Sequence, residues 1–308
     1  MEQKTVELAV QFFSILYNTA DLALGFFDGV HLGHQALVTA CCHLAKRTGC
    51  IPGAVTFTSH PDALVTSMPP LLINTISQRQ QLLLAYGIAD ILALPFDEGL
   101  RNMPWQAFLD FLLEKGAAGF VCGNDFRFGR GGEGSAAKLA SFCQARNLPY
   151  AIVPEQTLDG MRISSTHIRA LIENGDIETA ARFLGHPHTM CGEVTHGRQL
   201  GRTIGIPTAN LSIPVGVVVP KHGVYATTCV FDGEQHAAVT NIGSRPTVGG
   251  HQVRAESWIL DFDGELYGKT VTLLFHKFLR PERKFDSLEA LRAEIQKNAA
   301  ETRKIFEK

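Results

Sequence analysis

Short apolar runs and longer stretches with helical spacing alternate along the chain from about residue 22 to residue 153. Such runs, bounded by Gly, Pro or polar residues, predict buried strands separated by helices. The predicted strands are Leu22–Gly25, Gly53–Phe57, Ala89–Leu94, Gly119–Cys122 and Tyr150–Val153. The predicted helices are Gln35–Arg47, Ser77–Tyr86, Pro104–Lys115 and Ser135–Arg146. This order predicts right-handed crossovers and a parallel sheet with helices on both faces.

The pattern changes near residue 184. Two more predicted helices, from Ser164 to Glu173 and from Asp176 to Phe183, precede Leu184–Pro187, where helical spacing stops. The β-rich runs that follow predict a small antiparallel barrel. These runs are Thr189–Val194, Val215–Val219, Val224–Phe231, Gln235–Thr240, Ser257–Phe262 and Thr270–Phe275. We therefore expect two domains, an α/β domain at residues 1–184 and a β-barrel domain at residues 185–308.

A terminal helix is predicted after the barrel. Asp286 and Glu289 have the spacing of a capping box, and Leu288, Leu291 and Ile295 form an apolar stripe at helical spacing. We expect this helix to plug or flank the barrel.

Composition narrows the class of protein. The length of 308 residues favours two domains, and 45% apolar with 19% charged residues is typical of a soluble globular protein. A net charge of −2 without a long basic run argues against nucleic acid as a partner and leaves small molecules. The apolar run at residues 8–13 is too short for a membrane span and has no basic leader. Seven cysteines without a Cys-x-x-Cys pair predict reduced thiols and a cytoplasmic location, and self-association is left open.

The stretch Gly25–His34 joins the first predicted strand to the first predicted helix through three glycines. Backbone N–H groups and the helix dipole make such a junction suitable for an anion, and glycines let a bulky ligand approach the backbone. His31 and His34 are three residues apart, so both imidazoles could reach one phosphate chain. Ligands of parallel sheets bind at the carboxyl ends of strands, so loops 58–61 and 123–134 are expected at the same edge.

Other sites compete with this interpretation. The two imidazoles alone lack a third ligand for zinc. Gly129–Gly134 satisfies G-x-G-x-x-G between a strand and a helix, with Glu155 near the expected acidic position, so an NAD- or FAD-binding loop is the strongest rival. Against it, Asn124–Phe128 separates these glycines from the strand. Gly264–Thr270 is one residue short of a P-loop and precedes a strand, which indicates a β-turn region.

The second half has its own motif in Gly192–Asn210. Its glycines and arginines are Gly192, Gly197, Arg198, Gly201, Arg202 and Gly205. Phosphoryl transfer to a hydroxyl needs a phosphate cradle, Mg²⁺ and a base. Thr208 and Asn210 alternate along an extended segment and offer neutral oxygen ligands, and Glu256 is a candidate base.

These motifs resemble those of the bifunctional bacterial FAD synthetases, which combine riboflavin kinase and FMN adenylyltransferase modules in one chain. Gly25–His34 is similar to the His-x-Gly-His signature of nucleotidylyltransferases, and Ile163–Arg169 to the family motif that covers the triphosphate. Pro207–Asn210 is similar to the Pro-Thr-Ala-Asn motif of riboflavin kinases. The resemblance implies a Rossmann-like nucleotidylyltransferase domain and a riboflavin kinase barrel. It also implies Mg²⁺, ATP as co-substrate, and riboflavin, FMN and FAD as substrates or products.

The resemblance also implies roles for individual residues. The implied catalytic residues are His31, His34, Arg169 and Glu256, and the implied metal ligands are Thr208 and Asn210. Nucleotide or flavin contacts in the first half are implied for Gly25, Phe27, Asp28, Gly29, His60, Asn124, Asp125, Arg127, Ser164, Ser165 and Thr166. Those in the second half are implied for Gly192, Gly197, Arg198, Gly201, Arg202, Pro207, Arg280, Arg283 and Phe285. His167 stands where relatives often have arginine and receives no role.

The predicted function is two successive steps that each consume ATP: riboflavin to FMN, then FMN to FAD and pyrophosphate. An NAD-dependent oxidoreductase built on Gly129–Gly134 is one alternative. A flavin-binding regulator with an inactive module is the other, and the complete sets of candidate catalytic and metal-binding residues argue against it.

Overall fold

The computed structural model describes residues 19–196, 205–247 and 250–306, and contacts divide the chain into two compact units, residues 1–165 and 166–308. By these contacts the helices α7 (Ser165–Asn174) and α8 (Ile177–Leu184) group almost entirely with the barrel. The assignment of one activity to residues 1–184 and the other to residues 185–308 stays a prediction.

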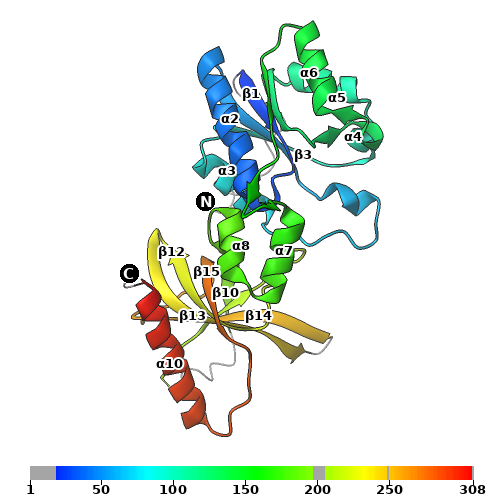
Figure 1. The fold of residues 1–308 in the computed structure, drawn as a ribbon. Coiled ribbons are helices and arrows are strands. Elements are labelled where there is room, and N and C mark those ends of the chain that lie inside the picture. Colours follow the sequence, from blue (N-terminus) through cyan, green and yellow to red (C-terminus); the bar gives the residue numbers. More distant parts are fainter. Residues whose placement is uncertain (1–18, 197–204, 248–249, 307–308) are drawn as a thin grey trace. The chain divides into compact units, whose positions relative to one another are not determined.

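Five parallel strands form the sheet of the first unit, in the order β3-β2-β1-β4-β7 (Figure 1). They are β1 (Ala20–Leu24), β2 (Ile51–Phe57), β3 (Asp90–Leu94), β4 (Ala117–Gly123) and β7 (Tyr150–Val153). The chain runs outward from β1 to β3 and then returns to place β4 on the other side of β1, so the strand order reverses between β1 and β4. Parallel sheets bind ligands outside the carboxyl ends of strands at such a reversal. The predicted parallel sheet is confirmed.

Helices cover both faces of this sheet because its strands carry apolar side chains on both sides. In β1, Ala23 faces the core under α2 and α3, whereas Leu22 and Leu24 face the core under α5 and α6. The helices are α2 (Leu32–Thr48), α3 (Ile76–Ala85), α4 (Glu98–Arg101), α5 (Trp105–Glu114) and α6 (Ala136–Ala145). The short elements are η1 (Asp28–Val30), η2 (Pro61–Leu64), β5 (Arg127–Phe128), η3 (Arg130–Gly132), β6 (Gly134–Ser135), β8 (Thr157–Leu158) and β9 (Met161–Arg162).

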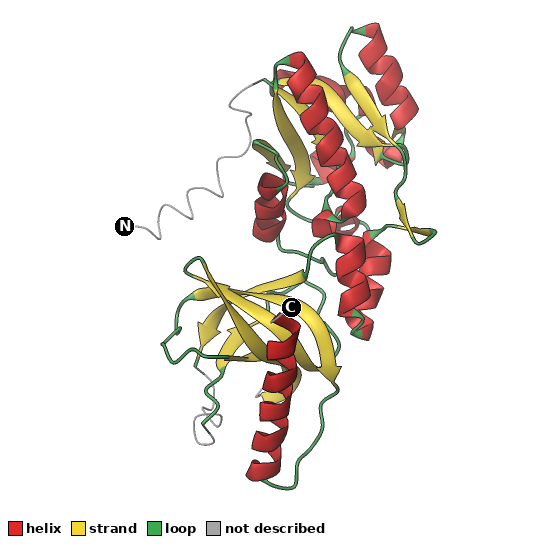
Figure 2. Ribbon diagram, turned by 60° about the vertical axis from the view of Figure 1, so that its left-hand side comes forward, coloured by secondary structure: helices red, strands yellow, loops and turns green. Residues whose placement is uncertain are grey.

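Six strands close into an antiparallel barrel in the second unit, in the order β10-β11-β14-β13-β12-β15. Figure 2 shows the strands of this barrel in yellow. They are β10 (His188–Thr195), β11 (Ala209–Ser212), β12 (Gly223–Phe231), β13 (Glu234–Thr247), β14 (Gly250–Ile259) and β15 (Thr270–Arg280). Closure pairs every strand and leaves no open sheet edge. The predicted barrel is confirmed, but the strand predicted at Val215–Val219 is wrong. Pro214 and Gly216, which has a φ of 82°, favour a turn there, and β11 supplies the strand instead.

The last helix, α10 (Leu288–Phe306), lies against the barrel (Figure 1). Its Ala299 belongs to one buried cluster with Val224, Val239 and Leu260 of the barrel. The predicted terminal helix is confirmed, but its predicted cap is one residue early. The Ser287 hydroxyl accepts the N–H of Ala290 at 3.1 Å, so Ser287 satisfies the first turn instead of Asp286.

Candidate functional site

A pocket of about 220 Å³ lies at the carboxyl ends of β1, β4 and β7. Seven predicted site residues line it: Gly25, His31, His34, Asn124, Asp125, Ser164 and Ser165. They come from the segment between β1 and the first turn of α2, from the loop after β4, and from the residues that lead into the start of α7. The fold therefore brings three motifs that are distant in sequence to one pocket beside the strand-order reversal.

The two imidazoles of the first motif form a stacked pair. His31 is the N-cap of α2, and its Nδ1 accepts the backbone N–H of His34 at 3.3 Å. The ring centroids are 3.6 Å apart with an interplanar angle of 12°. Because Nδ1 of His31 accepts this bond, the neutral ring carries its proton on Nε2. A Cβ at Gly33 would lie 3.2 Å from the His31 ring, so glycine favours this close packing.

His34 is held in its neutral form. Burial lowers the pKa of His34 well below its ordinary value, and the nearby His31 and Arg79 lower this pKa further. A neutral imidazole donates one hydrogen bond and accepts one, so at neutral pH His34 offers hydrogen bonding without a full positive charge.

Three other residues of the motif shape the loop from behind the pocket. Phe27 is completely buried in the core, with its ring edge-on to the His34 ring at 5.3 Å between centroids. The buried Asp28 carboxylate accepts the Ile73 N–H at 2.8 Å. Gly29 has a φ of 82°, which favours glycine. These contacts and the Gly29 φ help to fix the conformation of the loop, and the predicted nucleotide or flavin contacts of the three residues stay predictions.

The second motif is tied to the first by a hydrogen bond within the first unit. Ser165 donates its hydroxyl to the backbone carbonyl of Asp28 at 2.9 Å. Thr166, His167 and Arg169 follow on α7 and belong to the second unit by their contacts. The predicted roles of Thr166 and Arg169 at the triphosphate stay predictions, and His167 has no predicted role.

Two predicted contacts lie elsewhere in the first unit. His60 begins η2, where its Nδ1 accepts the Asp62 N–H at 3.1 Å and its ring meets the Phe26 ring edge-on. Arg127 is exposed on β5. Neither side chain is among those that line the 220 Å³ pocket, and their roles in binding stay predictions.

The sequence analysis missed Arg162 in this pocket. Its guanidinium forms ion pairs with Asp125 and with Glu155, the latter at 3.0 Å between Nε and Oε2. Arg162 reaches the pocket because β8 and β9 form a hairpin whose turn, Asp159-Gly160, has positive φ at both positions. The Asp-Gly pair beside a basic residue and the serine motif was the available signal.

The Gly129–Gly134 loop has a structural explanation. It connects β5 to β6 in a short antiparallel pair. A Cβ at Gly129 would lie 2.6 Å from the Trp105 Cα, and one at Gly134 would lie 2.7 Å from the Phe128 carbonyl. Gly129 and Gly134 are therefore needed for packing against the protein's own backbone, which weakens the dinucleotide-loop interpretation.

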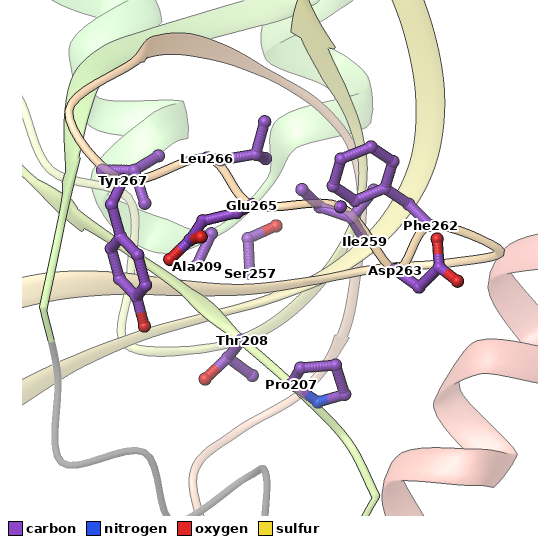
Figure 3. A pocket seen from close by; sticks show the side chains of 12 residues that line it. Pro207, Thr208, Ala209, Ser257, Ile259, Phe262, Asp263, Glu265, Leu266 and Tyr267 are labelled. Carbon is purple, nitrogen blue, oxygen red and sulfur yellow. The ribbon is translucent and has the colours of Figure 1, made fainter.

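The barrel carries two pockets that share one residue. The first, of about 330 Å³, is lined by Pro207, Thr208 and the loop from Phe262 to Tyr267 (Figure 3). The second, of about 370 Å³, is lined by Thr208, Glu256 and mostly apolar side chains of β-strands and α10. Thr208 therefore lies between the two pockets. Asp263, Glu265 and Tyr267 line the first pocket, and the Glu256 carboxylate of β14 lines the second, mostly apolar one.

Asn210 lies beside this shared wall. It pairs with Glu256 across β11 and β14 and is 6% exposed. Its Oδ1 is buried and has no hydrogen-bond partner among the described residues, whereas its Nδ2 donates to the Thr208 carbonyl at 3.4 Å. A buried amide oxygen without a donor suits a hard cation such as Mg²⁺. No group of three or more His, Cys, Asp or Glu side chains in the described ranges could hold a metal.

Three further predicted residues line the apolar pocket: Arg280, Arg283 and Phe285. The two guanidinium groups lie 5.5 and 4.8 Å from the Phe285 ring centroid. Both arginines form ion pairs with Glu294 of α10. The arginines are thus positioned by the terminal helix at the rim of this pocket.

The remaining predicted residues are divided between β10 and the loop after it. Gly192 lies in β10, where an added Cβ would meet the Ser212 carbonyl of β11. Gly197, Arg198, Gly201 and Arg202 lie outside the residues that the structure describes.

The α/β unit with its imidazole pair and the barrel with its paired pockets define a two-domain transferase that handles phosphorylated ligands. Residues 16–167 match the family model described as FAD synthetase, and residues 184–306 match the model described as riboflavin kinase. The chain belongs to the bifunctional riboflavin kinase/FMN adenylyltransferase family. The predicted family and the predicted pair of activities are confirmed.

Similar proteins extend over nearly the whole chain. A bifunctional riboflavin kinase/FMN adenylyltransferase of Listeria monocytogenes is 35% identical over 93% of this chain and 92% of its own length. Its counterpart in Escherichia coli K12 is 34% identical, with 92% of each chain covered. A crystal structure described as a macrolide-efflux protein from Streptococcus pneumoniae has a TM-score of 0.86 at 29% identity, covering 94% of this chain and 95% of that chain. In the described ranges of this chain, no helix is long and apolar enough to cross a bilayer.

Proposed function

We propose that the barrel phosphorylates riboflavin with ATP to give FMN and ADP. ATP occupies the pocket lined by Pro207 and the Phe262–Tyr267 loop, and the flavin occupies the apolar pocket under α10. The 5′-hydroxyl of the ribityl chain then lies next to Glu256, which accepts its proton as the oxygen bonds to the γ-phosphorus and the β–γ bond breaks. The observation that carries this proposal is Thr208, which lines both pockets.

Mg²⁺ is part of this proposal. Thr208 and the buried Oδ1 of Asn210 would hold the ion, which neutralises charge on the phosphates of ATP when bound. The phosphates are proposed to be covered by the region that contains Gly192, Arg198 and Arg202. The flavin is proposed to contact Arg280, Arg283 and Phe285.

We propose that the sheet pocket then transfers AMP from ATP to FMN. An oxygen of the FMN phosphate attacks the α-phosphorus, a new phosphorus–oxygen bond forms, and pyrophosphate leaves. The α2 N-terminus, His31 Nε2–H and neutral His34 stabilise the negative charge that develops on the leaving group. Arg169 is proposed to add a cation, and Asn124 and Asp125 to contact the ring systems.

Separation of the products tests the two steps. Incubation with riboflavin and Mg-ATP is expected to give FMN first and FAD later, and removal of Mg²⁺ with a chelator is expected to stop both. Failure to form either flavin nucleotide would overturn the proposal. Strong NADH binding without ATP turnover would instead support the oxidoreductase alternative.

We further propose that the protein acts in the cytoplasm on small molecules, with no nucleic-acid partner. All seven cysteines are free thiols, which supports a reducing compartment. Self-association stays a prediction, to be tested by light scattering with and without ligands.

A further inference from the structure

The loop that carries the imidazole pair has a strained backbone. Phe27 has a φ of 59° and Val30 a φ of 41°, in the left-handed region that bulky and β-branched residues rarely adopt. Such conformations cost free energy and persist only where surrounding groups hold them. Asp28 gives part of that support through its hydrogen bond from the Ile73 N–H. A second residue, which the sequence analysis did not identify, also supports this loop.

Arg79, on α3, is completely buried, contacts the Phe26 ring of this loop directly and reaches the Phe26 backbone through Thr56 of β2. Its guanidinium carbon lies 4.1 Å from the centroid of the Phe26 ring, which lines the pocket. Its Nη1 donates to the Phe57 carbonyl at 2.9 Å and to the Thr56 hydroxyl at 3.1 Å. That hydroxyl donates to the Phe26 carbonyl at 2.8 Å. Arg79 therefore holds both the ring and the backbone of Phe26.

Stability alone does not explain an arginine at this position. The Nε and Nη2 atoms of Arg79 are buried without a hydrogen-bond partner in the described part of the chain, as are both amide atoms of Asn74. Burying a cation with unsatisfied N–H groups is costly, and an apolar side chain of similar volume is often neutral or stabilising. The cost of this buried charge points to a role in the pocket next to it.

The charge of Arg79 reaches the imidazole pair. Burial lowers the pKa of Arg79 to about 10, while the nearby Asp28 opposes that shift, so the guanidinium stays charged at neutral pH. The same charge contributes, after burial and His31, to the lowered pKa of His34. A buried cation thus favours the neutral form of His34.

We propose that Arg79 is a positioning residue for adenylyl transfer, which holds Phe26 and the strained loop so that His31 and His34 face the bound phosphates. Arg79 does not line the pocket itself, so it acts through the residues that do. The inference rests on the proposed function of the sheet pocket. It adds a residue that lies 45 positions beyond His34 in the sequence.

Three variants separate the contacts of Arg79 from its charge. Arg79→Gln removes the charge and the ring contact, and Arg79→Lys keeps the charge but loses the planar fork. Thr56→Val keeps Arg79 but removes the hydroxyl that links its Nη1 to the Phe26 carbonyl. The matched control is Arg146→Gln, because Arg146 stacks on Phe142 at 3.8 Å in the same unit without lining the pocket. Riboflavin phosphorylation by the barrel serves as an internal control for each variant.

We expect kcat/KM for FMN adenylylation to fall on the order of 10- to 100-fold in both Arg79 variants, because displacement of catalytic groups by about 1 Å has effects of this size. Thr56→Val should reduce the same kcat/KM by a smaller factor. The kcat/KM of Arg146→Gln should stay within about twofold of that of the unmodified protein. Riboflavin phosphorylation should be unchanged in all four.

A second measurement distinguishes positioning from a general structural role. The His34 ring can be followed by NMR in protein labelled with ¹⁵N-histidine, with its signal assigned by loss in His34→Gln. Its pKa should rise in Arg79→Gln, where the neighbouring cation is gone, and stay near its original value in Arg79→Lys and Thr56→Val.

Normal adenylylation in Arg79→Gln with an unmoved His34 titration would overturn the inference. If Arg79→Gln fails to fold, normal adenylylation in both Arg79→Lys and Thr56→Val would overturn it as well. These results differ from failure of the proposed function, in which the unmodified protein itself would not convert FMN to FAD.

Discussion

Protonation of His188 should destabilise the barrel at mildly acidic pH. His188 begins β10 opposite Phe275 of β15 and is 2% exposed. Neither ring nitrogen has a hydrogen-bond partner among the described residues, and the ring lies 5.6 Å from the Phe275 ring. Burial, with a smaller effect of His186, lowers the pKa of His188 from 6.5 to about 3. The informative change is His188→Leu, which removes the titrating group and the buried nitrogens.

The sign of the change in folding stability with pH follows from proton binding in the folded and unfolded states. The unfolded chain takes up a proton at His188 below about pH 6.5, whereas the folded barrel does so only near pH 3. Folding stability is therefore unaffected by this group above pH 6.5 and falls as the pH drops below it. A pH of about 5 lies about 1.5 units below the pKa of histidine in the unfolded chain. Protonation of the unfolded chain therefore lowers the free energy of unfolding by about 2 kcal/mol, at ~1.4 kcal/mol per unit. The free energy of unfolding should fall between about pH 7.5 and about pH 5, and His188→Leu should make this fall smaller by about 2 kcal/mol.

Urea unfolding at these two pH values measures the effect. The chain has two tryptophans, Trp105 in the first unit and Trp258 in β14, so a Trp105→Phe background leaves Trp258 as a reporter of the barrel. The exposed His222 provides the control variant His222→Leu. Equal loss of stability with pH in the His188→Leu variant and the unmodified background would refute this account of His188.

Three further changes test separate parts of the molecule. His31→Ala should abolish FAD formation while FMN accumulates, because the imidazole lies in the sheet pocket; chromatography showing equal loss of both products would contradict independent sites. Glu256→Gln should reduce riboflavin phosphorylation on the order of 10²- to 10⁴-fold yet leave FAD synthesis from supplied FMN, and normal phosphorylation would remove Glu256 as the base. Gly129→Ala should lower the melting temperature by several degrees, since the φ of 74° disfavours a Cβ and the added Cβ would lie 2.6 Å from the Trp105 Cα. Gly131→Ala, with a φ of 62° but open space around it, should lose only the part due to φ, and an equal loss in both would show that contact with Trp105 is unimportant.

The sequence by itself determined the order and type of most elements, because burial imposes local periods that are visible in the chain. Leu22 and Leu24 alternate with Ala23 across the two faces of β1, and the switch after residue 184 from helical spacing to Asp-Gly turns marks the barrel. The glycine and histidine spacing also predicted the loop of the sheet pocket. Where two local signals competed, the sequence was less informative, as at Val215–Val219, where apolar residues favoured a strand and Pro214 with Gly216 made a turn.

Only the tertiary structure decided which residues act together, because contacts between distant segments leave no local period. Arg79 lies in an unremarkable helix in sequence, and its burial against Phe26 follows from the packing of α3 on the sheet. Thr208 became the wall between two pockets only through closure of the barrel, which sets β11 beside β14. The local pattern of apolar and polar residues indicates which side chains of a segment are buried and which are exposed. The pockets depend instead on strand order and register, which are fixed by packing across the whole unit.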